Sequence, residues 1–336
     1  MKKITIKEVA AEAGVSISTV SNALNDSPLV TPATRDKILQ TAERLNYIPN
    51  MNGRLLKAGK SKMIGFFSAS VGGFYFSTLI DSIYKQCDRH GYGLNIVAVK
   101  DKKVIMNHSL GGNLDGVIMF QSEVIGAEEV ALLKNHQVKT VFLDRMIQER
   151  WIASVLFDSF QAGYELTRHA ITLGHRRIYF IEGDESAYDS MERKRGFLAA
   201  MTEHGLPVGE DSILKGMFQE QFTYQMLTGK LQAGMCLPDA FIAGNDGSAI
   251  GCINALRDRG YQVPRDVSVA GFDDIEIAGY IQPPLTTVRN PVAGLGSEAV
   301  ETLMQMIDEG TSGTVKQLQG TLITRDSLAE CDSYQS

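Results

Sequence analysis

A segment near the amino terminus, "AGVSISTVSNALN" (13–25), carries hydroxyl and amide side chains where helices usually expose Lys and Glu. These polar residues are Ser16, Ser18, Thr19, Ser21, Asn22 and Asn25. Such side chains compete for backbone hydrogen bonds and form helices only moderately well. Apolar residues nevertheless recur at helical spacing between positions 15 and 24. Short side chains that donate and accept hydrogen bonds allow a helix to approach base edges and phosphates in a DNA major groove.

A second set of polar residues follows apolar runs in the rest of the chain, or an expected loop. The set consists of Asp144, Arg193, Asn245, Asp246, Asp273 and Asp274. Ligands of open α/β folds bind outside the carboxyl ends of the strands. Carboxylates accept from hydroxyls, while Arg and Asn donate to hydroxyl or ring oxygens, so the set suits a polyhydroxyl ligand. An Asp after a strand is often a helix cap instead, and we expect Asp246 and Asp274 to be structural and Arg193 to lie at a helix start.

The residues around the first set predict a head of three helices. The segment "TIKE" (5–8) has the spacing of a capping box, and Gly14 can end this first helix with a positive φ. Ser16 can cap a second helix, and "TP" (31–32) places a cap and a first-turn proline at the start of a third. Two short helices around a glycine turn, braced by a third, make a helix-turn-helix. A small helical bundle with a polar surface is the alternative.

Beyond residue 62 the sequence alternates between strand and helix signals. Short apolar runs such as "MIGFFSA", "DGVIMF" and "RRIYFIEG" are separated by amphipathic stretches. This alternation favours parallel sheets covered by helices. The roughly 275 residues involved exceed what one hydrophobic core usually supports, so we expect two lobes.

The charge is distributed unevenly along the chain. The net charge is −6, yet residues 1–60 contain nine Lys and Arg against five Asp and Glu. A basic N-terminal head on an acidic body indicates that the head binds a polyanion.

Other features of the sequence indicate the cellular compartment and the kinds of chemistry to expect of the protein. The start of the chain has no signal peptide pattern, and no apolar run is long enough to span a membrane. The four cysteines are widely spaced, which favours a reducing cytoplasm over a disulfide or zinc framework. GxSxG, HExxH and P-loop motifs are absent from the sequence. We therefore predict no enzyme activity, no catalytic or metal-ligating residues and no cofactor.

Several motifs in a fixed order resemble one known family. The segments "TIKEVAAEAGVSISTVSNALN", "TPATRDKI", "LNYIPN" and "LITRDSL" together resemble the lac repressor (LacI/GalR) family of bacterial transcription regulators. The resemblance covers nearly the whole chain. It implies an α/β fold, with an N-terminal three-helix helix-turn-helix head and a two-lobed, periplasmic-binding-protein-like α/β body. The implied domains are a DNA-binding domain (1–48), a hinge helix or linker (49–60) and an effector-binding and dimerisation domain (61–336).

The resemblance also assigns DNA contacts. Ile17, Ser18 and Asn22 match positions that touch base edges. Four residues match positions near phosphates, namely Ser16, Thr19, Ser21 and Asn25. Thr5 completes the predicted DNA-binding set of the head.

The hinge segment matches a helix that folds on operator DNA and enters the minor groove. Its predicted DNA-binding residues are Asn50, Gly53 and Leu56. Leu56 matches a leucine that wedges between base pairs and kinks the duplex. Gly53 stands where relatives often have Ala and loosens the hinge, since Gly costs about 1 kcal/mol of helix propensity.

Effector contacts are implied for residues of the body. They are Asp144, Arg193, Asn245 and Asp273, with Phe76, Phe157 and Phe218 as aromatic or apolar walls and Asn290 as a further candidate. Aromatic rings would cover the apolar face of a sugar, although a lone Phe is more often part of a core.

The sequence thus predicts a cytoplasmic, homodimeric transcriptional regulator, most simply a repressor of a carbohydrate-utilisation operon. It would bind near-palindromic operator DNA, and a small-molecule effector would bind between the lobes. A sugar or sugar phosphate fits the carboxylate-rich site best, with a purine as the alternative effector; no membrane partner is expected. The alternative class is a cytoplasmic sugar-binding protein or sugar-processing enzyme without a DNA role.

Overall fold

The computed structural model describes residues 4–47, 60–121 and 124–331. The chain divides into two compact units, Met1–Ser61 and Lys62–Ser336, which we call the head and the body. Most of the predicted hinge, and with it Asn50, Gly53 and Leu56, lies outside the described residues.

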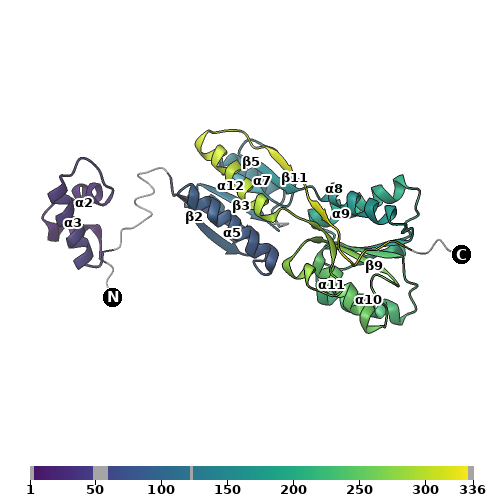
Figure 1. Cartoon of the computed structure of the whole chain (residues 1–336). Helices are drawn as coiled ribbons and strands as arrows, with labels where there is room; N and C mark the ends of the chain where they lie inside the picture. Colours follow the sequence, from purple (N-terminus) through teal and green to yellow (C-terminus); the bar gives the residue numbers. More distant parts are fainter. Residues whose placement is uncertain (1–3, 48–59, 122–123, 332–336) are drawn as a thin grey trace. The chain divides into compact units, whose positions relative to one another are not determined.

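The head contains three helices, α1 (Ile6–Ala13), α2 (Ile17–Leu24) and α3 (Pro32–Arg44) (Figure 1). Their apolar faces pack into one core, whose buried members are Val9, Ala10, Ala13, Val20, Ala23, Val30, Ile38 and Ala42. The predicted three-helix head is therefore confirmed.

Local signals set the helix ends of the head as the sequence predicts. Gly14 ends α1 in the left-handed region, with φ 66°. The Ser16 hydroxyl accepts from the backbone of Thr19 at the start of α2. Thr31 caps α3 in the same way, with Pro32 in the first turn.

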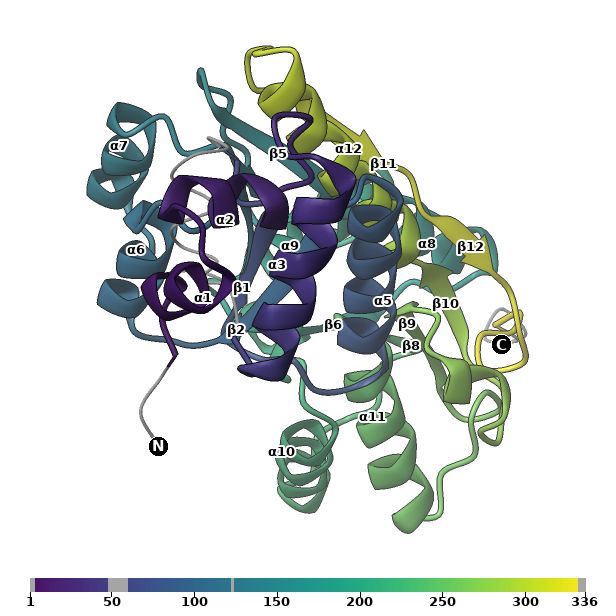
Figure 2. The same cartoon turned by 90° about the vertical axis from the view of Figure 1, so that its left-hand side faces the viewer.

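The first lobe of the body is built on an all-parallel sheet with the strand order β11-β5-β4-β3-β1-β2. The strands are β1 (Met63–Ser68), β2 (Gly93–Ala98), β3 (Gly116–Phe120), β4 (Thr140–Phe142), β5 (Ile152–Phe157) and β11 (Val315–Leu318). Its helices are α5 (Phe74–Arg89), α6 (Lys102–Leu110), α7 (Ala127–Asn135) and α12 (Val292–Asp308). Helices α5 and α12 pack side by side, as Figures 1 and 2 show.

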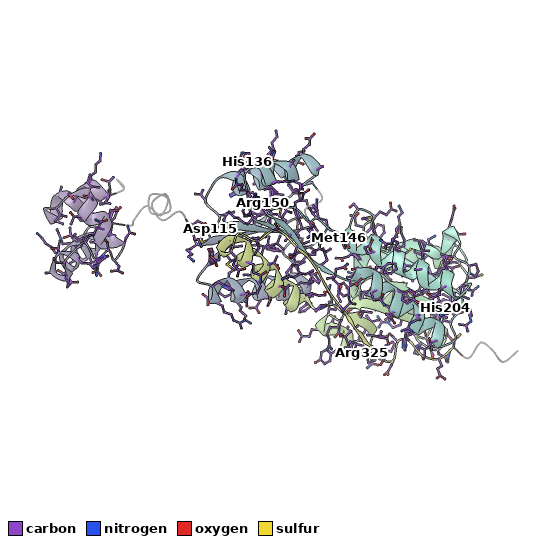
Figure 3. All side chains as sticks on the ribbon, turned by 90° about the horizontal axis from the view of Figure 1, so that it is seen from above. Asp115, His136, Met146, Arg150, His204 and Arg325 are labelled. Atoms are coloured by element: carbon purple, nitrogen blue, oxygen red, sulfur yellow. The ribbon has the colours of Figure 1, made fainter. Side chains whose placement is uncertain are left out.

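The second lobe contains a sheet of the order β12-β10-β9-β8-β6-β7, in which β12 is antiparallel to β10. The strands are β6 (Ile178–Glu182), β7 (Ile213–Lys215), β8 (Ala240–Ala243), β9 (Ser268–Asp273), β10 (Thr286–Arg289) and β12 (Thr321–Ile323). Its helices are α8 (Ser159–Thr172), α9 (Tyr188–Glu203), α10 (Glu220–Gln232) and α11 (Asp246–Asp258), with short 3-10 turns at Glu210–Ser212 and Glu276–Gly279. In Figure 3, His136 and Arg150 lie on the first lobe and His204 and Arg325 on the second. Two lobes of parallel strands covered by helices confirm the predicted fold class.

The chain passes between the lobes three times, from β5 to α8, from β10 to α12 and from β11 to β12. Two of these crossings are bonded to each other. The backbone N–H of Asp158 donates to the Leu318 carbonyl at 2.9 Å, and the Gln319 side chain donates to the Asp158 carboxylate at 2.9 Å. Hydrogen bonds therefore join the β5-to-α8 crossing to the β11-to-β12 crossing.

Among the residues that the structure describes, no helix is long and apolar enough to cross a membrane. In the same residues, His, Cys, Asp and Glu side chains form no group that could hold a metal ion.

Candidate DNA-binding surface and effector site

The N-terminal turn of α2 presents the predicted recognition residues to solvent. Ser16, Ile17 and Ser18 are exposed, and Ile17 exposes 45% of its surface although it is apolar. The Ser16 hydroxyl lies 2.7 Å from the Ser18 hydroxyl and 2.8 Å from that of Thr19. This hydroxyl cluster fixes side chains that could contact phosphates, and the exposed Ile17 is free to contact an apolar group such as a thymine methyl.

Other predicted head residues are held by local hydrogen bonds. The Asn25 amide donates to the Ser21 carbonyl at 2.8 Å. Ser21 and Asn22 are partly buried on the same helix. Thr5 donates from its backbone N–H (2.7 Å) and its hydroxyl (3.0 Å) to the Glu8 carboxylate. The Thr5 hydroxyl thus takes part in the capping box that stabilises the start of α1.

Arg193 is the centre of the candidate effector site in the body. Its side chain is only 3% exposed. One terminal nitrogen donates to the Gly244 carbonyl at 2.5 Å, and the other donates to the Asp273 carboxylate at 3.1 Å. The prediction that Arg193 lies at a helix start is wrong, because α9 already begins at Tyr188 and Arg193 falls in its second turn. Asp189 in the first turn favours this earlier start through the helix dipole.

Three aromatic rings surround the guanidinium of Arg193. Its central carbon lies 4.9 Å from the ring centre of Phe272, 5.5 Å from that of Phe157 and 5.8 Å from that of Phe218. These distances suit cation–π attraction, which is strongest away from water. Phe157 and Phe218 were predicted as walls of the site. Phe272 was not predicted from the sequence, although it directly precedes Asp273.

A cavity of about 370 Å³ opens between the two lobes, beside Arg193. Five predicted residues line it, namely Phe76, Arg193, Phe218, Asn245 and Asp273. Nine further lining residues were missed: Gly72, Gly73, Phe74, Tyr75, Phe120, Gln121, Asp189, Gly247 and Ile275. The walls include the carboxyl ends of β3 and β9, where ligands of open α/β sheets bind.

Three other predicted effector residues do not line this cavity. Asp144 pairs with its neighbour Arg145, with 3.1 Å between carboxylate and guanidinium. Phe157 is 2% exposed and supports Arg193. Asn290 is buried in the wall of a neighbouring cavity.

Asn245 already uses both ends of its amide within the protein. Its oxygen accepts from the backbone of Ser248 at 2.8 Å and thereby caps α11. Its nitrogen donates to the Phe218 carbonyl at 3.1 Å. The structure therefore makes Asn245 a helix cap that also holds the backbone of Phe218.

Asp189 is an acidic residue of the cavity that was not predicted from the sequence. It accepts from the Ser159 hydroxyl at 2.6 Å. Burial raises the pKa of Asp189, while the positive charge of Arg193 opposes this rise. Burial also raises the pKa of Tyr75 well above its ordinary value. Asp189 and Tyr75 both line the cavity.

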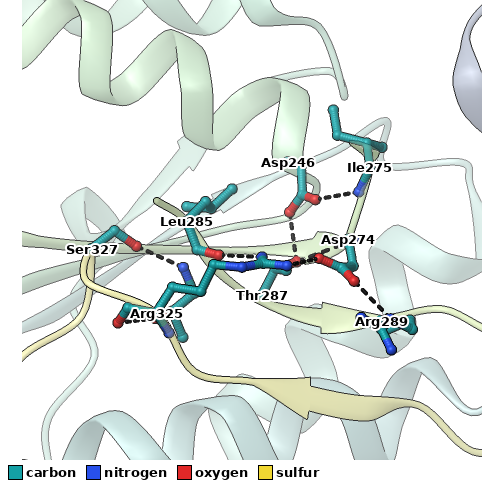
Figure 4. Close-up of polar contacts among 9 residues, drawn as sticks. Asp246, Asp274, Ile275, Leu285, Thr287, Arg289, Arg325 and Ser327 are labelled. Carbon is teal, nitrogen blue, oxygen red and sulfur yellow. Dashed lines mark hydrogen bonds and ion pairs between the residues drawn. The ribbon is translucent and has the colours of Figure 1, made fainter. Parts of the chain in front are cut away.

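The side chain of Asp246, whose polar contacts are drawn in Figure 4, is fully buried. It accepts from the Thr287 hydroxyl at 2.6 Å and from the backbone N–H of Ile275 at 2.9 Å. Burial and the nearby charge of Asp273 raise its pKa to about 8. Asp246 thus ties the loop after β9 to strand β10.

Asp274 is held on the other side of the same loop (Figure 4). Arg289 reaches it at 2.7 Å and Arg325 at 2.6 Å. Burial alone would raise the pKa of Asp274, but the hydrogen bonds from Arg325 and Arg289 outweigh burial and lower it. Asp246 and Asp274 therefore both have structural partners, as expected for residues behind the site.

Comparison with known proteins agrees with this architecture. Residues 5–50 match the family "Bacterial regulatory proteins, lacI family", and residues 167–328 match the "Periplasmic binding protein-like domain".

Full-length relatives are also similar. The chain is 34% identical over 329 residues to the Probable HTH-type transcriptional repressor ExuR of Bacillus subtilis (strain 168), covering 97% of this chain and 98% of that one. It is 32% identical over 329 residues to the HTH-type transcriptional repressor PurR of Vibrio parahaemolyticus, covering 96% and 98%. Among solved structures, the lac repressor dimer bound to operator and the anti-inducer ONPF matches with a TM-score of 0.82 at 25% identity, covering 98% and 100%.

A helix-turn-helix head followed by a periplasmic-binding-protein-like body defines a DNA-binding transcriptional repressor. The chain belongs to the lacI family of bacterial regulatory proteins. The family and the fold class predicted from the sequence are confirmed.

Proposed function

We propose that this repressor binds a near-palindromic operator as a homodimer and is controlled by a small-molecule effector in the cavity between its lobes. The observation that carries the proposal is the cavity itself, where Arg193 is held buried among carboxylates and aromatic rings. A second independent support is the exposed start of α2, which suits contact with DNA. Two heads on a near-palindrome give the specificity that one recognition helix lacks.

A sugar or sugar phosphate fits the cavity best. Asp189 and Asp273 can accept hydrogen bonds from ligand hydroxyls, and Gln121 can donate and accept. Phe76 and Phe218 offer rings to the apolar face of a sugar. A carbohydrate-utilisation operon is the corresponding target that we propose.

The effector is bound rather than converted in this proposal. The relatives described above are repressors, and the polar groups of the cavity are largely engaged in holding one another. Incubating the purified chain with sugars and following product formation tests this; turnover at a measurable rate would support the sugar-processing alternative.

The first prediction is that Arg193→Ala abolishes the ligand response of operator binding. The substitution removes the group that orders Asp273, Phe218 and the Gly244 carbonyl. Operator binding without ligand should stay nearly intact if the ligand is an inducer, and repression should weaken if it is a corepressor. A thermal-shift screen against sugars and sugar phosphates first identifies a ligand, since a hundredfold excess over Kd stabilises the native state by about 2.7 kcal/mol. Operator gel shifts with and without that ligand then give the response.

Arg195→Ala is the matched control. Arg195 lies on the same helix, pairs with Glu192 and leaves 65% of its side chain exposed. It should keep the full response. A full ligand response in Arg193→Ala, with a normal melting curve, would contradict the proposed site.

A further inference from the structure

A short turn of the first lobe carries the single tryptophan of the chain, Trp151. Residues 149–152 form this turn, which is closed by two backbone hydrogen bonds between Glu149 and Ile152, at 3.0 and 3.1 Å. Trp151 occupies the third position of the turn with φ 75°, in the left-handed region that turns usually fill with Gly or Asn. A bulky side chain costs conformational energy in this region, and such strain is concentrated at functional positions.

The ring of Trp151 does not serve a hydrophobic core. None of the hydrophobic clusters formed by the described residues contains it. Two cations lie over the ring instead. The Lys139 ammonium is 5.2 Å from the ring centre, and the central guanidinium carbon of Arg150 is 4.8 Å from it. The strained position is therefore held by a residue that gathers positive charge; we call Lys139, Arg150 and Trp151 the Trp151 cluster.

Both charges of the Trp151 cluster are available to an anion. Among the residues that the structure describes, neither Lys139 nor Arg150 takes part in an ion pair, and Arg150 is exposed. Glu149, the acidic residue of the turn, is already paired with Lys134, with 2.6 Å between carboxylate and ammonium. The turn therefore presents an excess of positive charge on a body whose overall charge is negative.

The cluster lies at the edge of the sheet where the chain enters the body. Lys139 directly precedes β4 and Trp151 directly precedes β5, just as Lys62 precedes β1. Because β1, β3, β4 and β5 are neighbouring parallel strands, the residues that precede them lie at the same edge. Figure 3 shows Arg150 on the same lobe as Asp115, whose carboxylate accepts from the backbone N–H of Lys62 at 3.0 Å. The chain that leads from the head thus joins the body at the edge that carries the cluster.

We propose that the Trp151 cluster binds backbone phosphates of the DNA duplex that the head holds. Lys and Arg side chains neutralise such phosphates, and the head is joined to this edge by the chain itself. Phosphate contacts carry no sequence information, so the cluster should add affinity for operator and random DNA alike. The contact lies outside the effector cavity and goes beyond the function proposed above.

Removing the two charges tests the contact on the full chain. In a variant with both Lys139→Gln and Arg150→Gln, the plot of log affinity against log salt concentration should become shallower by about one to two, since each phosphate contact contributes about 0.9 to its slope. Affinity for operator and random duplexes should fall by the same factor, about three- to tenfold. Fluorescence anisotropy with labelled duplexes measures both quantities. An unchanged slope and affinity, in a variant with a normal melting curve, would overturn the proposal while leaving the DNA-binding role of the head intact.

A variant with both Lys230→Gln and Arg259→Gln is the matched control. It removes the same two residue types from exposed positions on the second lobe, where neither has an ion pair among the described residues. Slope and affinity should stay those of the unmodified chain. An equal loss in the two variants would show that the total charge of the body acts on DNA binding, and it would contradict a contact at the Trp151 cluster.

Trp151 also reports on the contact directly, because its emission is the only tryptophan emission of the chain. Saturating the full chain with operator DNA should reduce the quenching of this emission by acrylamide, a neutral quencher, at least twofold. The variant without the two charges should lose most of this protection at equal saturation of the head. Equal quenching of the unmodified chain with and without DNA would show that DNA does not cover the Trp151 cluster, and the proposal would fail.

Discussion

Asp246 is the residue whose burial has the clearest measurable consequence. Its pKa rises from the ordinary 3.8 to about 8, mainly through burial. Between roughly pH 4 and pH 8 the folded chain therefore keeps a proton on this carboxyl that the unfolded chain has lost. Stability falls with rising pH wherever the native state binds the extra proton, by up to about 1.4 kcal/mol per pH unit.

The prediction is that Asp246→Asn becomes more stable relative to the unmodified chain as the pH rises from 5 to 8. The neutral amide can still accept from Ile275 and can donate to Thr287, without a titrating group. Urea unfolding of both proteins at several pH values measures the difference in free energy. A difference that does not change with pH would show that Asp246 is ionised in the fold.

At the scale of single elements, two neighbouring substitutions at the start of helix α2 should have different effects. One should lower the stability of the head, and the other should weaken operator binding. Ser16→Ala removes the cap of α2 and should lower the stability of the head by about 1 kcal/mol. Ile17→Ala truncates an exposed side chain and should change stability by less than about 0.5 kcal/mol. We nevertheless expect it to weaken operator binding, if Ile17 contacts bases as proposed. Denaturation curves and operator gel shifts on both variants check this, and equal operator affinity for Ile17→Ala and the unmodified chain would remove it from the contact set.

The packing of α8 against α9 is the second prediction at this scale. A Cβ added at Gly163 would collide with the carbonyl oxygen of Arg193, so Gly163→Ala must push the two helices apart. We expect a loss of about 1–3 kcal/mol and weaker effector binding, because α9 carries Arg193 and Asp189. Gly229→Ala on α10 meets no atoms and should stabilise the body by about 0.5–1 kcal/mol. Thermal unfolding of both variants decides, and a neutral Gly163→Ala would contradict this close contact.

These elements also show what could be predicted from the sequence. Gly14, Ser16 and Thr31 act on their own helix ends, so local patterns were enough to place the head. Alternating apolar runs likewise predicted the lobes, because each run forms one buried strand.

Contacts between distant elements could not be predicted in the same way. Asp189 was missed because its importance comes from Arg193, one turn along the helix, and from Ser159 on α8. Asn290 was assigned to the effector site, but the turn after β10 places it in the wall of the adjoining cavity. Residue types at strand ends identify the neighbourhood of a site, and the tertiary packing decides which side chains line it.

At the scale of the whole molecule, the lobes are joined by three crossings, two of which share hydrogen bonds through Asp158. A ligand that contacts Phe76 on one lobe and Arg193 on the other can shift how the lobes sit. We propose that such a shift alters the hinge segments of a dimer. A differential affinity of only a few kcal/mol between the two states is enough to switch DNA binding.

The last prediction concerns how the full chain binds DNA. Each phosphate contact releases counterions, so the logarithm of operator affinity should fall steeply and linearly with the logarithm of salt concentration. Phosphate contacts and base contacts contribute differently to this plot, because only the former set its slope. If Leu56 wedges between base pairs as proposed, Leu56→Ala should weaken operator binding far more than binding to random DNA, since the kink that it maintains depends on the sequence of the site. Its salt slope should stay close to that of the unmodified chain, because no charge is lost. Fluorescence anisotropy on operator and random duplexes at several salt concentrations measures both quantities, and an equal loss on the two duplexes would show that Leu56 contributes general affinity instead of a wedge.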